Sequence, residues 1–205
     1  NSTLKLNTSQ VLQIYADSGN QFASIQAYVD NLHSAKLIRS AHTANQLEEV
    51  LADFWFNHFN VNINDNFVRY SLQSYERDAI RPNAMGKFET LLKATAEHPA
   101  MLYYLDNYLS QASRTVNGRL VQGLNENYGR EILELHTVGV DAGYTQADVY
   151  EVARAFTGWG IDNLGRGGNF VYNPARHDTG SKSAFGLQIA AGGQKDDGER
   201  VIKYL

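Results

Sequence analysis

The sequence predicts a mainly α protein, an irregular multi-helix domain with a Gly-rich C-terminal loop region that leaves room for one short β-hairpin. Apolar residues recur at spacings of three and four along much of the first part of the chain, as they do on one face of a helix. The 205 residues include only three prolines, which permits long helices. Most of the seventeen glycines lie at or after Gly158. We therefore expect a helical body at 1–158, and a Gly-rich loop region with the start of a further helix at 159–205.

The bulk composition excludes several classes of protein. Apolar residues make up 43% and charged residues 20%, as in an ordinary globular protein. The net charge of −4 argues against a nucleic-acid partner, and no apolar run is long enough for a membrane span. The absence of cysteine excludes disulfides and thiolate metal sites. The chain begins at Asn1 and its last segment resembles a helix stopped in mid-course, so we expect a fragment of a longer protein.

The helical body is divided by its apolar stripes. The first two stripes are Phe22, Ile25, Val29 and Leu32, followed by Leu47, Val50, Leu51, Phe54 and His58. Thr43 and Gln46 have the spacing of a capping box in front of the second stripe. A third helix is expected from Phe67 to Ile80 and a fourth around Met85–Leu92, and Pro99 marks the start of another.

The second half of the body begins with a polar stretch, 107–122, which is predicted to be a loop. A helix follows at 127–138, with Gly139 as its C-cap. Thr145 and Asp148 have the spacing of a capping box for a helix that ends at Gly158. Beyond it, the segments "NFVYN" and "SAFGLQI" are expected to pair as two short strands.

Four phrases together resemble a known bacterial family. They are "LEEVLADFWFNHFNV", "YERDAIRPNAMGKFETLLKATAEHPAMLYYLDN", "NENYGREILELHTVGVDAGYTQADVYEVARAFTGW" and "HDTGSKSAFG". In order and spacing they resemble the family called domain of unknown function 1800, from about Lys36 to the end of the chain. The resemblance implies a mostly helical protein, longer than this chain and often exported, so a periplasmic or secreted location is expected. It also suggests a partner of the domain of unknown function 1501 family, whose genes often lie beside these. One departure is Gly129, where many members carry alanine.

The segment "NENYGREILELHTVGV" concentrates polar candidates. On a helical wheel, one face carries Asn127, Arg130, Glu131 and Glu134, and His136 lies on the opposite face. One interpretation is an ion-pair face in which Arg130 and Glu134 interact along the helix. The alternative is functional, with Glu131 and Glu134 as catalytic carboxylates in a cleft and with Asn127 and Arg130 binding.

Two histidines lie among apolar residues. His58 continues the second apolar stripe, beside Asn57, and His136 interrupts an apolar stretch of its own. Such histidines are commonly satisfied core residues. If their helices packed together, His58 and His136 would form a polar network or half of a metal site, with Asn57 as a binding residue. Imidazole with carboxylate oxygens suits zinc, iron or manganese.

The phrase "RHDTGSK" lies in the Gly-rich region, where function commonly resides. His177 and Asp178 can act as a catalytic base and its orienting partner, with Arg176 and Lys182 binding. The alternative is a turn in which Asp178 bonds its own backbone near Gly180.

Two functions remain open at this point. The first is a binding or assembly role, toward a partner protein or an envelope polysaccharide, because G-x-S-x-G, H-E-x-x-H and P-loop patterns do not occur. The second is a hydrolase-like enzyme, metal-assisted or not, in which His177 and Asp178 close over Glu131 and Glu134.

Overall fold

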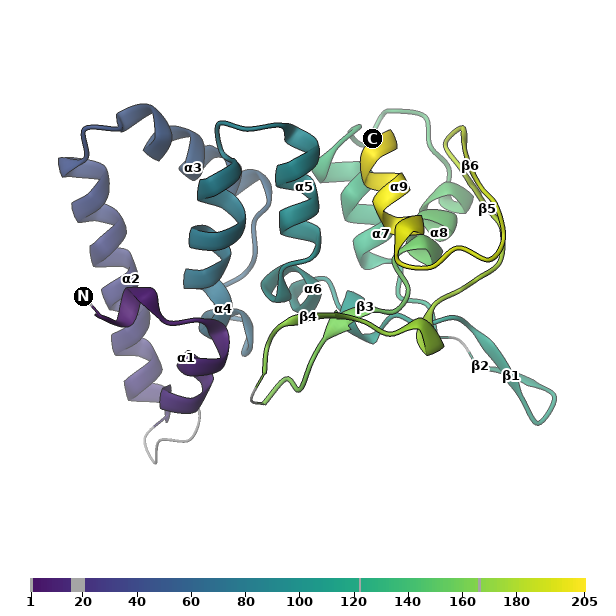
Figure 1. Ribbon diagram of the computed structural model, residues 1–205, viewed down its shortest axis with the longest axis horizontal. Helices are drawn as coiled ribbons and strands as arrows, with labels where there is room; N and C mark the ends of the chain where they lie inside the picture. The colour runs from purple at the N-terminus through teal and green to yellow at the C-terminus, as the bar shows by residue number, and fades with distance from the viewer. Residues whose placement is uncertain (1, 16–20, 122, 166) are drawn as a thin grey trace. The chain divides into compact units, whose positions relative to one another are not determined.

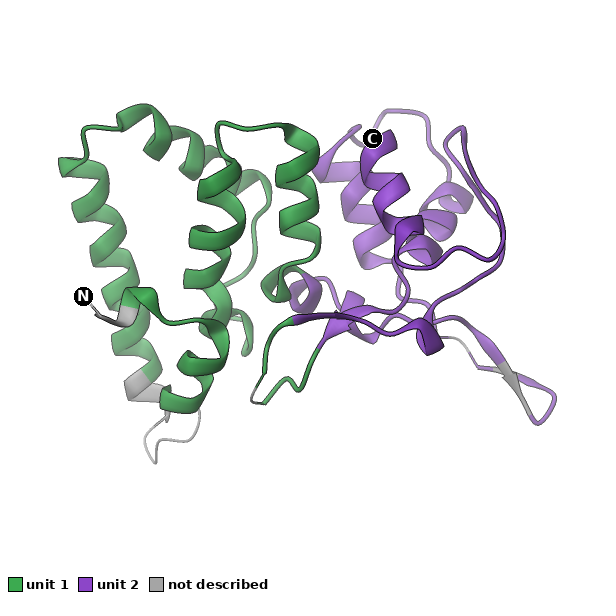
Figure 2. Cartoon of the chain, in the orientation of Figure 1, with its two compact units in different colours: residues 1–101, 162–169 green, residues 102–161, 170–205 purple. Residues whose placement is uncertain are grey.

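The chain forms two compact units in this computed structural model, which describes residues 2–15, 21–121, 123–165 and 167–205. Unit 1 comprises Asn1–Met101 and Asp162–Asn169, and unit 2 comprises Leu102–Ile161 and Phe170–Leu205 (Figure 2). The protein is mainly α, as predicted, and the described strands form three two-stranded antiparallel sheets. Among the described helices, none combines the length and the apolar character needed to cross a bilayer.

Unit 1 is built from helices (Figure 1). In order they are η1 (Ser2–Lys5), α1 (Thr8–Tyr15), α2 (Gln21–His42), α3 (Gln46–His58), α4 (Val68–Ser74), the π-helical turn η2 (Tyr75–Ile80), η3 (Arg81–Asn83) and α5 (Phe88–Ala96). A buried cluster of Val11, Ile25, Tyr28 and Leu32 joins α1 to α2. This agrees with the first apolar stripe, except that the side chain of Phe22 lies outside the described part of the chain.

The predicted capping box at the start of α3 is wrong. Asn45 precedes the helix and makes no side-chain capping bond. Instead, Gln46 Nε2 donates to the carbonyl oxygens of Ser40 and Thr43, at 3.0 and 2.9 Å. The side chain of Gln46 therefore satisfies carbonyl groups at and just after the end of α2. The Thr43 amide, which a capping box would bond to the Gln46 side chain, donates to the Arg39 carbonyl.

Unit 2 combines short helices with three hairpins. After α6 (Pro99–Tyr104), which spans the unit boundary, come η4 (Asn107–Leu109), β1 (Arg114–Val116), β2 (Arg119–Val121), α7 (Asn127–Glu131), the π-helical turn η5 (Ile132–His136), α8 (Gln146–Ala155), β3 (Trp159–Ile161), β4 (Phe170–Tyr172), η6 (Pro174–Arg176), β5 (Lys182–Ala184), β6 (Leu187–Ile189) and α9 (Asp196–Tyr204). Helix α8 packs against α7, β5 and α9. The buried rings of Tyr128, Phe156 and Trp159 form the centre of this unit.

The pairing predicted for the two C-terminal strands is wrong, and so is one predicted loop. "NFVYN" does not pair with "SAFGLQI": β4 pairs with β3, and β5 pairs with β6. The polar stretch 107–122, predicted to be a loop, contains the hairpin β1–β2, while its last residue, Gln122, lies outside the described residues. Each hairpin pairs strands close in sequence, which keeps the entropic cost of loop closure low. By contrast, the capping box of Thr145 and Asp148 is confirmed, with both of its hydrogen bonds present.

Candidate functional site

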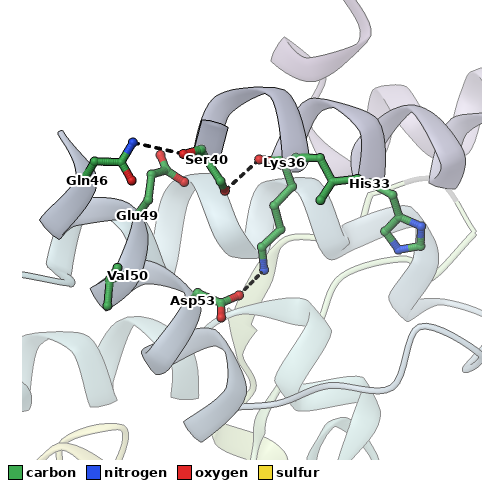
Figure 3. Close-up of a pocket in the computed structure, with 8 residues that line it drawn as sticks. His33, Lys36, Ser40, Gln46, Glu49, Val50 and Asp53 are labelled. Atoms are coloured by element: carbon green, nitrogen blue, oxygen red, sulfur yellow. Dashed lines mark hydrogen bonds and ion pairs between the residues drawn. The ribbon is translucent and has the colours of Figure 1, made fainter. Parts of the chain in front are cut away.

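A groove runs between α2 and α3 within unit 1 (Figure 3). Its volume is about 690 Å³. Each helix contributes one stripe of side chains at offsets of three, four and seven residues, so that each stripe lies on a single helical face. The lining residues are His33, Lys36, Leu37 and Ser40 from α2, with Gln46, Glu49, Val50 and Asp53 from α3.

Polar contacts hold the two sides of the groove together. Lys36 Nζ lies 2.6 Å from Asp53 Oδ1, and this ion pair joins α2 to α3 (Figure 3). The same ammonium group lies 5.1 Å from the centre of the Phe56 ring, a cation–π distance. Together with the bonds from Gln46 to the end of α2, these contacts fix the spacing of the two helices.

One wall of the groove is a buried carboxylate, Glu49. Nε of Arg39 lies 3.1 Å from each of its oxygens, and Nη1 of Arg81 lies 3.1 Å from Oε2. Burial alone would raise the pKa of Glu49, but hydrogen bonds from Arg81 and Arg39 outweigh burial and lower it. Glu49 is thus a charged group whose hydrogen-bonding capacity is already used by the protein itself.

The groove has an exposed apolar rim, which corrects the sequence analysis. Leu47, Val50 and Phe54 of the second stripe are 60%, 62% and 55% exposed, whereas the apolar stripe of an amphipathic helix normally faces the core. Helix α3 turns Glu49, Ala52 and the following Phe59 inward instead. Leu37 of α2, on the other side of the groove, is 71% exposed. Several large apolar side chains therefore gather in and beside one groove, where isolated exposed ones would need no explanation.

The "RHDTGSK" phrase forms a buried polar cluster in unit 2. His177 Nε2 and Lys182 Nζ lie 3.2 and 2.6 Å from Oδ2 of Asp197, the second residue of α9. All three side chains are buried. Asp197 was not among the residues singled out in the sequence, and its Asp-Gly context at the start of a helix gave no signal of this contact.

Asp178 and Arg176 are both tied to structure nearby. Arg154 binds Asp178 through Nε and Nη2 at 2.9 and 2.8 Å, and the Gly180 amide donates to Asp178 Oδ1 at 2.9 Å. The hydrogen bond from Arg154 is the main reason why the pKa of Asp178 is lowered. Arg176 donates to the carbonyl oxygens of Tyr108 and Leu109. These contacts hold the loop against its neighbours.

The polar face of α7 and η5 contains a chain of contacts. Arg130 lies 3.3 Å from Glu134 and donates to Gln146 at 2.7 Å, while Asn127 contacts Asp106 at 3.5 Å. The pKa of Glu131 is raised, first by partial burial and then by the charge of Glu134. Glu134 is paired with Arg130, and the charges of both act on Glu131. In the described part of the chain, the hydrogen bonds and ion pairs of His177 and Asp178 involve other residues, namely Thr157, Asp197, Arg154, Gly180 and Lys182.

The histidines lie in separate units, and each has an aromatic neighbour. In unit 1, half-buried His58 makes edge contact with the rings of Trp55 and Phe59, and the amide of Asn57 donates to the Asp53 carbonyl. In unit 2, buried His136 lies 6.3 Å from the Tyr128 ring centre. A metal-holding group of three or more His, Asp or Glu side chains is not found in the part of the chain that is described. The pairing of His58 with His136 stays a prediction.

Sequence reasoning missed the groove as a site. The available signal was that α3 is apolar on two sides, since Leu47, Val50 and Phe54 lie opposite Ala52 and Phe59. A helix with apolar side chains all round is normally buried on all sides. Nothing in the sequence indicated that the α2 stripe would face the α3 stripe.

Comparison with known proteins gives one match. The family model described as "Protein of unknown function (DUF1800)" matches residues 3–205. Searches of curated proteins and of solved structures return no match. The resemblance seen in four phrases therefore extends over practically the whole sequence, and the chain belongs to the DUF1800 family of proteins of unknown function.

Proposed function

We propose that this protein is a binding or assembly module that holds a helix of a partner protein in the groove between α2 and α3. The observation that carries the proposal is the exposed apolar set Leu37, Leu47, Val50 and Phe54 in and beside that groove. An amphipathic helix presents apolar side chains at offsets of three, four and seven residues, which is the spacing of both lining stripes.

The character of the groove favours a protein partner over an envelope polysaccharide. Sugars are held by hydrogen bonds to polar side chains and by stacking on exposed aromatic faces. Here the largest polar groups, Glu49 and Lys36, are already engaged with Arg39, Arg81 and Asp53. Ser40 and Gln46 are bonded to backbone carbonyl oxygens, which leaves His33 as the other polar lining residue. The aliphatic part of the lining is Leu37 and Val50. Burying a side chain of this kind contributes about 1.5–3 kcal/mol, enough for a few such contacts to support binding.

A defined partner tests the proposal. The DUF1501-family protein suggested by the resemblance serves as the first candidate, and periplasmic or secreted co-localisation belongs to the same proposal. Isothermal titration with this protein measures affinity, and amide chemical shifts then report where the partner binds. Soluble glycan fragments form the second arm. We expect shifts on α2 and α3 with the protein and none with the glycans.

Two matched variants make the test specific. Val50→Asp places a charge in the groove at a residue that is 62% exposed, whereas Val140→Asp does so at a residue of unit 2 that is 64% exposed. Val50→Asp should weaken partner binding about tenfold or more, because a charge replaces an apolar contact. Val140→Asp should bind as the unchanged protein does. Equal affinities for all three proteins, or glycan binding that both variants retain, would refute the groove as the docking site.

A further inference from the structure

Lys182 and Asp197 form a contact in unit 2 that the proposed function does not use. Nζ lies 2.6 Å from Oδ2, and the side chains are 1% and 0% exposed. Lys182 lies at the start of β5 and Asp197 in the first turn of α9. A buried ion pair is costly because both charges lose their hydration, so its surroundings should show how the charges are accommodated.

The histidine beside this pair restricts where protons can lie. His177 Nδ1 is 2.7 Å from the carbonyl oxygen of Thr157, which only accepts, so Nδ1 carries a proton. In the neutral ring, Nε2 then has a lone pair that faces Oδ2 of Asp197 at 3.2 Å. Two acceptors do not attract each other, and the contact needs a proton between them.

The surroundings of Lys182 accommodate the transfer of one proton. Besides Asp197, Nζ has two acceptors, the carbonyl oxygens of Asp178 and Gly180 at 2.6 and 3.0 Å. A neutral amine has two hydrogens, which these carbonyls take up, and its lone pair then faces the carboxyl group. The third proton, placed on Oδ2, satisfies Nε2 of His177.

The carboxyl group itself is closely confined. Oδ1 of Asp197 accepts no hydrogen bond from the described residues. A Cβ atom at position 193 would lie 1.8 Å from Oδ1, so Gly193 leaves room only for the carboxyl group. A carboxylate would leave this oxygen charged and unsatisfied, which is more costly than leaving a neutral carbonyl oxygen there.

We propose that Lys182 and Asp197 condense to an isopeptide bond that links β5 to α9. One proton moves from Nζ to Oδ2, which gives a neutral amine and a neutral carboxylic acid. The Nζ lone pair then forms a bond to Cγ, a second proton passes from the nitrogen to Oδ2, and the Cγ–Oδ2 bond breaks as water leaves. His177 accepts the hydrogen bond of the acid and keeps its proton in place. The amide retains one N–H, directed at the Asp178 carbonyl.

The bond would act as a covalent cross-link between β5 and α9. The chain contains no cysteine, so disulfides are not open to it. An isopeptide bond between 182 and 197 closes a loop permanently and lowers the entropy of the unfolded chain, as a disulfide does. It would also hold the loop that carries His177 and Asp178.

Mass spectrometry of the intact, folded chain tests the proposal. Condensation removes one water, so we expect a mass about 18 Da below that of the sequence. Trypsin should fail to cut after Lys182 and should release a branched product, peptide 177–195 joined to peptide 196–200. A succinimide at Asp197-Gly198 would also remove one water, so fragmentation must place the link at Lys182.

Lys182→Arg is the matched control because it keeps a cationic side chain that cannot form this amide. It should show the full mass. The proposal is overturned by a folded, unchanged protein that has the full mass and is cut after Lys182. It is also overturned by a water loss that persists in Lys182→Arg, since that loss would come from the succinimide.

Discussion

Gly129 of α7 lies against Ala153 of α8 so closely that a Cβ atom at position 129 would be 2.8 Å from the Cβ of Ala153. The backbone nitrogen and Cα of Ala153 would be 2.8 and 2.9 Å away. Alanine is the better helix former by about 1 kcal/mol, so helix propensity alone predicts that Gly129→Ala stabilises α7. Overpacking against backbone costs about 1–3 kcal/mol. We expect Gly129→Ala to lower the midpoint of urea unfolding.

The packing explanation has its own controls. Ala153→Gly removes one of the close contacts but itself costs about 1 kcal/mol of helix propensity. Gly129→Ala should therefore cost less in the Ala153→Gly protein than in the unchanged protein. Gly165→Ala, whose Cβ would meet Asn163 Oδ1 at 4.0 Å and no other described atom within that distance, should have little effect. A Gly129→Ala protein with a raised midpoint would show that the two helices are free to separate.

The Asp148 carboxylate accepts hydrogen bonds from two separate segments, the start of α8 and the β5–β6 turn, and this gives a second prediction. Its Oδ2 accepts the Thr145 amide at 2.7 Å, and its Oδ1 accepts the Phe185 amide, in the β5–β6 turn, at 2.6 Å. Loss of an N-terminal cap costs about 1–2 kcal/mol, so Asp148→Ala should lower the free energy of unfolding at neutral pH by at least this amount. Asp141→Ala, at an exposed position in the preceding turn, is the control and should have little effect.

The pH dependence of this effect has a definite sign. The pKa of Asp148 is lowered from 3.8, first by the hydrogen bond with Thr145 and then by the Phe185 amide. The charged form is therefore favoured by folding, and its stabilisation is present above pH 3.8 and is lost as the pH falls below that value. The difference between Asp148→Ala and the unchanged protein should shrink over the same range. A difference that grows on acidification would contradict this assignment.

Much of the helical fold follows from local chemistry. The burial of Ile25, Val29 and Leu32 and the capping box of Thr145 and Asp148 were predictable, because each depends on residues within a few positions of one another. The exposure of Leu47 was not predictable. Periodicity identifies a face of a helix, but the face that is buried depends on which neighbours the rest of the chain supplies.

The residues of the candidate sites were predictable from the sequence only in part, for the same reason. His177 and Lys182 were singled out by their residue types, but Asp197 was not, since it joins them only through tertiary folding. Likewise, the stripe from His33 to Ser40 becomes one side of a groove only because α3 turns Val50 and Asp53 toward it. Contacts between segments distant in sequence are what pattern analysis of one sequence does not supply.

The surroundings of His98 should make the folded protein less stable in acid. Its Nδ1 accepts the Ala100 amide at 3.1 Å, which requires an unprotonated nitrogen. Burial, offset in part by the charge of Asp78, lowers the pKa of His98 from 6.5 to about 3. Between these two values the unfolded chain binds a proton that the folded chain does not, so stability falls as the pH decreases from 6.5 toward 3.

Substitution separates His98 from the other titrating groups. His98→Gln keeps an acceptor near the Ala100 amide and does not titrate, so its stability should depend less on pH across this window. His42→Gln, at an exposed position of α2, should leave the pH profile unchanged. Unfolding midpoints measured from pH 7 to pH 4 provide the comparison. Parallel profiles for His98→Gln and the unchanged protein would exclude His98 as the source.

The two ion pairs at the groove should differ in their contribution to stability. Glu49 is buried and shared by Arg39 and Arg81, whereas Lys36 and Asp53 are 34% and 56% exposed. Exposed pairs contribute about 0–1 kcal/mol, so Lys36→Met should have little effect on unfolding. Glu49→Gln leaves the guanidinium groups of Arg39 and Arg81, which are 32% and 18% exposed, short of a charged acceptor. Breaking such a pair costs more, about 3 kcal/mol where burial is complete. Because Arg81 keeps Glu48 as a partner, we expect a loss somewhat below that limit.

The pKa of Glu49 lies below 4.5, so this difference between the variants should persist at neutral pH and fade as the pH falls below 4.5. Denaturation curves for both proteins at pH 7 and pH 3 test the ranking, and equal losses at pH 7 would show that Glu49 is hydrated in solution.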